Sequence, residues 1–248
     1  MTEYTKSELM VASAAREIHD DDAVFVGIGV PTLACGLAKQ LHAPNLTMIY
    51  ESGTIDTTFD ELPLSIGDPE LAGGSRSIVS LYDVFCKYLQ AGRIDVGFLG
   101  GAQIDRYGNI NSTVIGDYDD PTVRLPGSGG ACEIASNANR TVIITPHEPR
   151  RLPESVDFAT SPGHVTTDDE PTRSGSPEAI ITDKAIMRFD ESGDANVESI
   201  HPGVRPDEVQ QATGWELSLD GVDETAEPKE KELDIIRNRL DPNRRYTG

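Results

Sequence analysis

The sequence has few basic residues, and lysine is scarce among them. It contains 42 acidic and 21 basic residues, only six of which are lysine, and its formal net charge is −21. A nucleic-acid-binding surface needs clustered Lys and Arg to neutralise phosphates, so this balance excludes nucleic acid as a partner. The acids are dispersed along the chain. Such a surface fits a cytoplasm at molar salt, where charge is screened within about 3 Å, and predicts a halophilic source.

Cysteine is also scarce, and long apolar runs are missing. The three cysteines lie far apart without a C-x-x-C spacing, which argues against zinc or disulfides and predicts reduced thiols. No run of about 18 apolar residues is present, so no membrane-spanning helix is expected. The first residues lack the apolar core of a signal peptide, and we expect a cytoplasmic protein. The five histidines show no metal-binding or triad pattern, and we assign them no catalytic role.

The chain does contain an alternation of short apolar strands and amphipathic helices. Thr5 and Glu8 form a capping-box pattern at the start of a first helix. The expected strands cover residues 23–26, 46–50, 96–99, 141–145 and 179–182, and the expected later helices cover 32–41, 78–89 (with Gly92 as a cap) and about 228–240. This pattern predicts one α/β domain over residues 1–248, with a parallel or mixed sheet and flanking helices. Sites in such sheets lie beyond the carboxyl ends of the strands.

Glu51-Ser52-Gly53 directly follows the second expected strand. An acid there lies at the rim of the sheet, and Gly53 leaves room for a close approach. Such a carboxylate could act as a general base or as a nucleophile. Acids also end strands in contact with water or as caps of the next segment, and spacing alone favours that simpler interpretation.

Two glycine-rich turns could present backbone N–H groups to a ligand. Gly27-Ile28-Gly29-Val30-Pro31 lies between a strand and a helix, where the helix N-terminus favours anions. It lacks the third glycine of the dinucleotide fingerprint and the lysine of a P-loop, so turn formation explains it equally well. Gly127-Ser128-Gly129-Gly130-Ala131 suits an oxyanion or a pantetheine amide, although a surface loop uses glycine in the same way.

The segment from Gln103 to Asn109 contains alternating side chains and a Gly-Asn pair, which predicts a hairpin. Gln103 and Asn109 could hold a substrate carboxylate or CoA, although hairpin geometry alone accounts for Asn109. Residues 168–177 have the composition of an exposed insertion.

Several of these segments together resemble the β subunits of family I CoA-transferases, and they are very similar to glutaconate CoA-transferase β subunits. The resemblance rests first on Tyr50-Glu51-Ser52-Gly53 and on residues 97–113, and it extends from the first helix to Leu240-Asp241-Pro242. Further matching motifs are Ile115-Gly116-Asp117-Tyr118, the turn from Gly127 to Ala131, His147-Glu148, Arg150-Arg151 and Thr160-Ser161-Pro162-Gly163.

The resemblance implies the CoA-transferase fold and a covalent chemistry. Glu51 would attack an acyl-CoA thioester and come to carry CoA, which an acceptor acid then takes. By resemblance, Gly129 and Gly130 supply the oxyanion donors. CoA is then a substrate, and no tightly bound cofactor or metal is implied. The implied CoA-binding positions are Gly27, Ile28, Gly29, Val30, Pro31, Gln103, Asn109, Gly127 and Ala131.

The resemblance also implies a partner. Family β subunits pair with an α subunit of similar fold, in an α2β2 or larger heteromer whose active site lies at the interface. One alternative is a CoA-dependent hydrolase or ring-opening subunit of the same superfamily, but such relatives typically lack the glutamate at position 51. The other is a non-catalytic acyl-CoA-sensing module, whose relatives carry a helix-turn-helix and a basic surface that this chain lacks.

Overall fold

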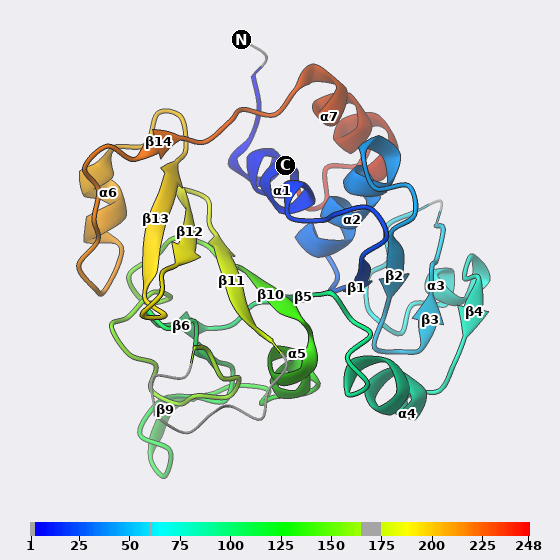
Figure 1. The fold of residues 1–248 in the computed structure, drawn as a ribbon, viewed down its shortest axis with the longest axis horizontal. Helices are drawn as coiled ribbons and strands as arrows, with labels where there is room; N and C mark the ends of the chain where they lie inside the picture. Colours follow the sequence, from blue (N-terminus) through cyan, green and yellow to red (C-terminus); the bar gives the residue numbers. More distant parts are fainter. Residues whose placement is uncertain (1–2, 60, 165–174) are drawn as a thin grey trace. The chain divides into compact units, whose positions relative to one another are not determined.

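The computed structural model describes residues 3–59, 61–164 and 175–248 (Figure 1). The chain forms two compact units: residues up to 98 together with 227–248 make unit 1, and residues 99–226 make unit 2. Both units combine helices with parallel and antiparallel strands, which confirms the predicted α/β class. Of the predicted insertion, residues 168–174 lie outside the described part, and its last two residues begin a strand.

Unit 1 contains three main helices, of which two contact the third, central one (Figure 1). They are α1 (Lys6–Arg16), the central α2 (Val30–Leu41) and α7 (Glu230–Ile235). The predicted capping box of α1 is confirmed. The Glu8 N–H donates to the Thr5 hydroxyl at 3.2 Å, and the Thr5 N–H donates to the Glu8 carboxylate at 2.8 Å. Helix α1 is too short to be stable alone, so the burial of its apolar face supplies most of its stability.

The sheet of unit 1 has the strand order β5-β1-β2-β3-β4. Strand β1 (Ala23–Phe25) runs parallel to β2 (Thr47–Ile49) and to β5 (Val96–Leu99), which agrees with the predicted parallel or mixed sheet. Strands β3 (Thr54–Ile55) and β4 (Ser77–Ile78) are antiparallel additions beyond β2. The parallel strands are largely buried, as is usual where helices cover them, whereas both residues of the edge strand β4 are exposed.

Between β3 and β4 the chain forms α3 (Pro69–Gly73), which was not among the predicted helices. The Asp68 carboxylate accepts the N–H groups of Leu64 at 2.9 Å and Glu70 at 3.1 Å. An acceptor side chain at this position satisfies N–H groups that have no partner in the first turn of a helix. The segment is therefore ordered by its own hydrogen bonds.

The helix predicted over 78–89 begins later than its spacing indicates. Ile78 lies in β4, and the prediction is wrong there because Ser80 starts the helix by accepting the Asp83 N–H at 3.1 Å. Helix α4 (Leu81–Asp83) continues as the π-helix η1 (Val84–Leu89). Gly92 then has a φ of +67°, the left-handed conformation in which glycine ends a helix.

The C-terminal segment closes unit 1 against its N-terminus. Helix α7 continues as the π-helix η2 (Ile236–Leu240), which matches the predicted helix at about 228–240. Arg237 donates to both oxygens of the buried Glu8 carboxylate, at 2.6 and 2.8 Å. The Thr5 hydroxyl donates to the Thr247 carbonyl at 2.8 Å. Both chain ends are therefore fixed to the same unit.

Asp241 organises the last turn of the chain. Its carboxylate, in a residue that is 1% exposed, accepts the N–H groups of Arg245, Tyr246 and Thr247 and the Thr247 hydroxyl, at 2.7 to 3.0 Å. Burial alone would raise the pKa of Asp241, but these donors outweigh it and hold the pKa below its ordinary value.

Unit 2 has the strand order β10-β11-β12-β13-β14. The pairs β10–β11 and β13–β14 are parallel, and the pairs between them are antiparallel. Strands β10 and β11 overlap the strands predicted over 141–145 and 179–182, whereas β12, β13 and β14 were not predicted. The bounds are β10 (Arg140–Ile144), β11 (Ser176–Ile181), β12 (Ala185–Phe189), β13 (Ala195–Ile200) and β14 (Asp223–Glu224).

Two hairpins and two short helices complete unit 2. The predicted hairpin is confirmed as β6 paired antiparallel with β7, and β8 pairs in the same way with β9. The bounds are β6 (Gln103–Ile104), β7 (Ile110–Asn111), β8 (Val114–Gly116), β9 (Pro121–Arg124), α5 (Ala131–Asn137) and α6 (Pro206–Gln211).

A buried histidine joins three parts of unit 2. His147 is 2% exposed, and its ring nitrogens lie 2.9 Å from the hydroxyls of Thr182 and Thr213. The backbone N–H of His147 donates to the Asp183 carboxylate at 2.7 Å. Burial, assisted by the nearby Lys184 charge, lowers the pKa of His147 to about 4. The ring is therefore neutral at neutral pH and serves the fold.

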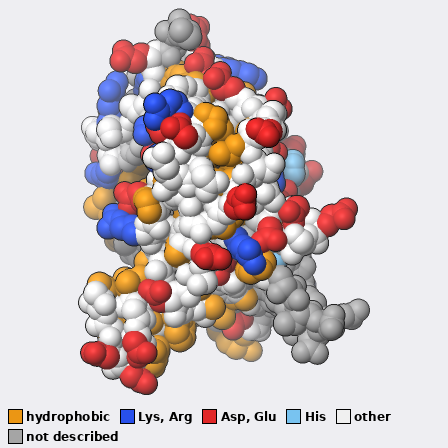
Figure 2. Space-filling model, turned by 90° about the vertical axis from the view of Figure 1, so that its left-hand side faces the viewer, with side chains coloured by type: hydrophobic (Ala, Val, Ile, Leu, Met, Phe, Trp, Pro, Cys, Tyr) orange, Lys and Arg blue, Asp and Glu red, His pale blue; other side chains and the backbone are white. Residues whose placement is uncertain are grey.

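The surface agrees with the composition. Acidic side chains are scattered over the face drawn in Figure 2 and do not gather into one tract. Within the described residues, no helix is both long and apolar enough to cross a membrane.

Candidate active site

Glu51 lies in a tight turn at the carboxyl end of β2. The Tyr50 N–H donates to the Thr54 carbonyl at 3.0 Å, and the Gly53 N–H donates to the Tyr50 carbonyl at 2.9 Å. These bonds fold the chain back from β2 into β3 and place Glu51 and Ser52 at the tip. The predicted position of Glu51, directly after a buried strand, is therefore confirmed.

The Glu51 carboxylate is not used by the fold. Glu51 is half-buried, and its side chain makes no hydrogen bond or ion pair with any residue in the described ranges. A carboxylate that caps a segment would accept N–H groups, as Asp68 does. An unengaged carboxylate at a strand end keeps its lone pairs for a reactant, which a nucleophile requires.

The turn after β1 lies at the same edge of the sheet as Glu51. Phe25 pairs with Ile49 in parallel register, and the Val26 N–H donates to the Ile49 carbonyl at 2.9 Å. Gly27 and Glu51 each follow two residues after this pair. The fold of unit 1 thus brings Glu51 and the predicted Gly27–Pro31 turn together at the carboxyl ends of adjacent parallel strands, where ligands bind in α/β sheets.

The Gly27–Pro31 turn leads directly into α2. Gly29 is the N-cap, with a φ of +91° that favours glycine, and Pro31 lies in the first turn as predicted. A Cβ at Gly29 would lie 3.6 Å from the Tyr246 ring, so the C-terminal segment packs beside this turn. Ile28, Val30 and Pro31 are half-buried. The turn offers backbone and small apolar surface, with no charged side chain of its own.

Tyr50 anchors the turn from within. It is fully buried, and its hydroxyl lies beside that of Thr32 without a well-aligned hydrogen bond to any described residue. The Thr32 hydroxyl donates to the Gly27 carbonyl at 2.8 Å. Burial raises the pKa of Tyr50, and Thr32 offsets only part of this effect. Tyr50 is thus neutral and fixed in the core, and it anchors the turn that carries Glu51.

Gly53 is required by the approach of a neighbouring strand. Its φ is +103°, and an added Cβ would lie 2.0 Å from the Val79 carbonyl oxygen. The Val79 N–H donates to the Gly53 carbonyl at 2.9 Å. The room that glycine provides is therefore filled by the chain after β4.

Lys39 and Asp56 support this turn, and sequence reasoning missed both. Asp56 follows β3 with a φ of +51°, and its N–H donates to the Met48 carbonyl at 2.6 Å. Its carboxylate pairs with the Lys39 ammonium of α2, which also donates to the Leu46 carbonyl at 3.0 Å. Seventeen residues separate the pair, and no local sequence signal predicts such a contact.

The Gly127–Ala131 turn belongs to unit 2. Gly127 and Gly129 have φ values of +96° and +50°, and an added Cβ at either would meet no atom within 4 Å. The turn is held by the Gly127 N–H, which donates to the Ser112 carbonyl at 2.8 Å, and Gly130 leads into α5. The N–H groups of Gly129 and Gly130 find no acceptor within the described chain. They are therefore available to a ligand.

The side chains of Gln103 and Asn109 take part in the hydrogen bonding of unit 2. The Gln103 amide donates to Asp157 at 3.0 Å and accepts from Asn111 at 2.7 Å. The Asn109 amide donates to both oxygens of Asp105, and its oxygen accepts the Gly163 N–H at 2.8 Å. Both side chains therefore stabilise the hairpin region, and this accounts for their presence without a ligand.

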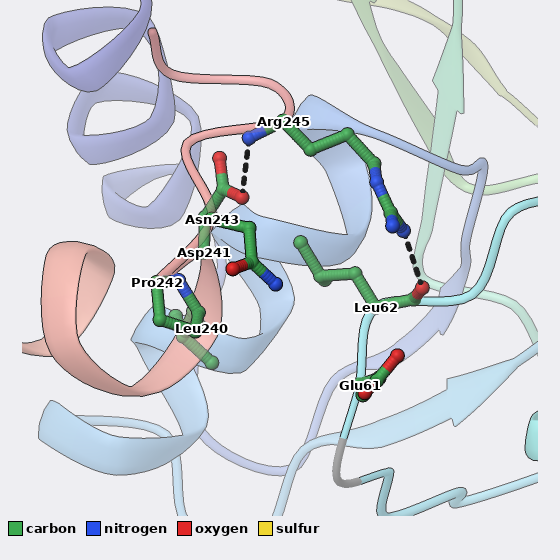
Figure 3. A pocket seen from close by; sticks show the side chains of 7 residues that line it. All are labelled: Glu61, Leu62, Leu240, Asp241, Pro242, Asn243 and Arg245. Atoms are coloured by element: carbon green, nitrogen blue, oxygen red, sulfur yellow. Dashed lines mark hydrogen bonds between the residues drawn. The ribbon is translucent and has the colours of Figure 1, made fainter.

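A small, partly open pocket of unit 1 has neither Glu51 nor the Gly27–Pro31 turn in its lining. It lies between the C-terminal segment and residues 61–62 and has room for about 30 Å³ of water-sized content (Figure 3). Arg245 spans it by donating to the Leu62 carbonyl at 3.2 Å, while its own N–H is held by Asp241. The pocket thus reflects how the C-terminal segment packs and is not part of the candidate active site.

The described residues do not meet the requirements of a metal site. No group of three or more His, Cys, Asp or Glu side chains that could hold a metal ion occurs among the residues described. Cys35 is buried, and Cys86 and Cys132 are half-buried, as predicted, and none of the three is in a disulfide here. Burial raises the pKa of Cys35, so this thiol is inert.

Comparison with known proteins identifies the class. The family model described as Coenzyme A transferase matches residues 8–212. The chain therefore belongs to the coenzyme A transferase family, which confirms the family that the sequence motifs resemble.

Individual relatives narrow the comparison. The chain is 46% identical over 243 residues to the B subunit of 3-oxoadipate CoA-transferase of Pseudomonas knackmussii, covering 96% of this chain and 94% of the relative. It is 35% identical over 255 residues to the B subunit of glutaconate CoA-transferase of Acidaminococcus fermentans, covering 99% and 96%. The solved structure of glutaconate coenzyme A-transferase from that organism matches with a TM-score of 0.92 at 34% identity, covering 100% of this chain and 98% of that chain.

A third relative has a different activity. The IpdB subunit of the cholesterol ring-cleaving hydrolase of Mycobacterium tuberculosis is 30% identical over 245 residues, covering 96% of this chain and 95% of the relative.

Proposed function

We propose that this chain is the B-type subunit of a heteromeric CoA-transferase, in which Glu51 carries CoA as a covalent thioester. The observation that carries the proposal is the Glu51 carboxylate, which the fold holds at the carboxyl edge of the parallel strands without engaging it. The named transferase relatives are B subunits that align with almost the whole chain. We therefore assign the missing part of the enzyme to an A-type subunit, in an α2β2 or larger assembly.

The reaction needs one carboxylate and no redox step. A Glu51 oxygen attacks the carbonyl carbon of the acyl-CoA, and the C–S bond breaks. CoA leaves as thiolate, and the acyl group stays on Glu51 as a mixed anhydride. The thiolate then attacks the glutamyl carbonyl carbon and displaces the donor acid as its carboxylate. The acceptor carboxylate enters, and the two steps run in reverse, which restores Glu51. Dividing the exchange into steps on one carboxylate preserves the energy of the thioester throughout.

Each step passes through an oxyanion that needs N–H donors already in place. The unused N–H groups of Gly129 and Gly130 are the proposed donors. By resemblance to the family, Gly27–Pro31 of unit 1 and, separately, Gly127 and Ala131 of unit 2 are the proposed contacts with CoA, because close backbone approach suits the pantetheine amides. Gln103 and Asn109 would contribute through the hairpin that they stabilise. CoA is a substrate in this scheme, and no tightly bound cofactor takes part.

The relatives suggest the class of acyl group. Both 3-oxoadipate and glutaconate, named in the two transferase relatives, are dicarboxylic acids. The Gly27–Pro31 turn and the tip of the Glu51 turn carry no basic side chain. The cation that holds a second carboxylate would therefore come from outside these two turns, and we assign it to the partner subunit.

A CoA-dependent hydrolase is the second candidate, because the IpdB relative aligns with the same length of chain. A hydrolase would deliver water to the acyl group, whereas a transferase must hold CoA on Glu51 until an acceptor acid arrives. The two differ in whether free CoA is released without an acceptor.

Trapping the intermediate tests the proposal. The chain is co-expressed with its A-type subunit, incubated with acyl-CoA and no acceptor, and digested for mass spectrometry. We expect the mass of CoA on the peptide that contains Glu51, with no steady release of free CoA. An unmodified peptide together with full transfer activity in Glu51→Ala would exclude the covalent mechanism.

The conservative variant is the matched control. Glu51→Asp keeps the charge but moves the carboxylate back by about 1 Å, and misplacement on that scale can cost roughly 10²-fold in rate. We expect transfer to fall by that factor while the complex stays intact by size-exclusion chromatography. Wild-type transfer in this variant would argue against a nucleophile at this position.

A further inference from the structure

Among the described residues, most of the large apolar side chains that are exposed come from one stretch of unit 1. Of the seven large apolar side chains exposed in the described ranges, five lie between residues 64 and 82, which we name the β4 edge segment. They are Leu64, Ile66, Ile78, Leu81 and Tyr82, exposed by 65, 39, 61, 55 and 67%. Single exposed apolar residues are ordinary, but Ile78, Leu81 and Tyr82 lie within five positions of one another along the chain, and such a concentration marks a contact surface.

The segment is well held, so these side chains are not simply those of a loose loop. The Thr57 hydroxyl donates to the carbonyl of the fully buried Leu71 at 3.0 Å. The Thr58 N–H donates to the Gly74 carbonyl at 3.1 Å. Just before the segment, Arg245 holds the Leu62 carbonyl (Figure 3). The apolar side chains therefore project from a fixed support.

Strand β4 also exposes backbone. It is the last strand of the unit 1 sheet, so one of its edges has no neighbouring strand among the described elements. Proteins usually protect such an edge with proline, with charge or with a covering segment, because it can pair with another chain. Strand β4 consists of Ser77 and Ile78, both exposed and neither of them proline or charged. Its edge therefore suits a polypeptide partner.

The charge around the segment argues against a second copy of this chain as the occupant. Residues 51–83 contain seven acidic residues and one basic residue, Arg76. Two such surfaces would repel each other when placed face to face, as would two chains of net charge −21. A complementary surface has an apolar centre and a rim of Lys or Arg.

We infer that the β4 edge segment is the docking surface for the A-type subunit of the proposed heteromer, which meets it with apolar side chains and a basic rim. The inference rests on the proposed function for the existence of that subunit. It goes further by assigning the contact to particular residues, with Ile78, Leu81 and Tyr82 at its centre.

Docking at this surface acts on the nucleophile. Val79, next to Ile78, donates its N–H to the Gly53 carbonyl at 2.9 Å, and Thr54 pairs with Ile78. Gly53 in turn closes the Glu51 turn through its bond to the Tyr50 carbonyl. A partner that packs on Ile78 therefore stiffens the support of Glu51 without touching the carboxylate.

Substitution at Ile78 tests the contact. Ile78→Asp places a charge at the centre of the patch, and we expect the Kd for the A-type subunit to rise by about tenfold or more, as for a central interface residue. Ile78→Val keeps an apolar, β-branched side chain and should bind as wild type. Val123→Asp is the control for location, since Val123 is 45% exposed on β9 of unit 2. Circular dichroism should show that all three chains stay folded.

The inference is overturned if Ile78→Asp binds as tightly as wild type, or if Val123→Asp weakens binding equally. It is also overturned if the wild-type chain does not bind the A-type subunit or pairs only with itself. Amide hydrogen exchange gives a second readout: the Val79 and Gly53 amides should exchange at least about tenfold more slowly in the complex than in the free chain. Unchanged exchange would contradict the coupling.

These outcomes are separate from the fate of the proposed function. A complex that assembles through Ile78 but never forms the CoA adduct would disprove the covalent mechanism and leave the docking surface in place. If the adduct forms equally well in wild type and Ile78→Asp, the docking surface is disproved and the covalent mechanism stands.

Discussion

Unit 1 contains carboxylates of two kinds. Asp241 and Glu8 are almost fully buried, and each accepts several hydrogen bonds, from the C-terminal backbone in one case and from Arg237 and Thr5 in the other. Glu51 is half-buried at the tip of a turn and accepts none from the residues described. The fold stabilises Asp241 and Glu8 as anions, whereas the Glu51 carboxylate stays free to interact with a ligand.

This difference separates structural from chemical use of the same group. A carboxylate saturated with donors has its lone pairs occupied and its pKa held low, so it is a poor nucleophile but a strong anchor. The pKa values of Asp241 and Glu8 are both lowered: in each, the donors outweigh a burial effect that acts in the opposite direction. An unengaged carboxylate contributes little to stability, and its replacement should cost function alone.

The largest expected effect is on activity at position 51. Glu51→Gln keeps the shape of the side chain but replaces the carboxylate that we propose as the nucleophile, and transfer by the assembled enzyme should fall by about 10⁴-fold or more. Urea unfolding of the free chain should be unchanged. A loss of stability comparable to the loss of activity would place Glu51 among the structural carboxylates.

The matched substitution at Asp241 should do the opposite. Asp241→Asn turns one acceptor oxygen into an amide that faces N–H donors, and we expect a loss of about 3 kcal/mol in the free energy of unfolding. Urea denaturation measures this loss, and the specific activity of the folded fraction should stay near wild type. A stable variant would show that the C-terminal turn does not depend on its carboxylate.

Acid should separate the buried histidine from the buried carboxylates. The folded state holds the pKa of His147 at about 4, below its ordinary 6.5, so the unfolded chain takes up a proton first as the pH falls. Stability should therefore fall by about 2 kcal/mol between pH 7 and 5. The contributions of Asp241 and Glu8 are lost only below their unfolded pKa values of 3.8 and 4.5. Unfolding free energies across this range should show the loss in wild type and not in His147→Gln.

The smallest effect concerns the helix cap that supports Glu8. Thr5→Ala removes the acceptor of the Glu8 N–H and should lower the free energy of unfolding by about 1 kcal/mol. Thr5→Ser keeps the hydroxyl and should restore most of it. Equal unfolding curves for all three chains would mean that the capping box contributes nothing measurable.

The sequence predicted local features well. The capping box of Thr5 and Glu8, the strand ends before Gly27 and Glu51, and the left-handed Gly92 each depend on residues within one or two turns of the chain. Ile78 was placed wrongly because its spacing to Leu81 fits a helix by chance. The Ser80 and Asp83 cap, which lies between a strand and a helix, was the signal that could have corrected it.

The candidate site was predictable only in part, because much of its support is tertiary. The motif around Glu51 predicted where the turn lies. It did not predict that the Val79 carbonyl packs against Gly53 or that Lys39 pairs with Asp56. These contacts join residues 17 to 26 positions apart, and no periodicity records them. Sequence likewise could not show that the polar atoms of Gln103 and Asn109 are used within unit 2.

The bond between Thr5 and Thr247 has a consequence for how this protein is made. Because unit 1 is built from segments on both sides of unit 2, residues 227–248 must leave the ribosome before α1, α2 and the C-terminal segment can come together. Unit 2, encoded in between, leaves the exit tunnel earlier and can fold first. Glu51 is therefore synthesised early, yet unit 1, which supports it, is completed only after residues 227–248 have been synthesised, and any assembly that depends on unit 1 waits for them.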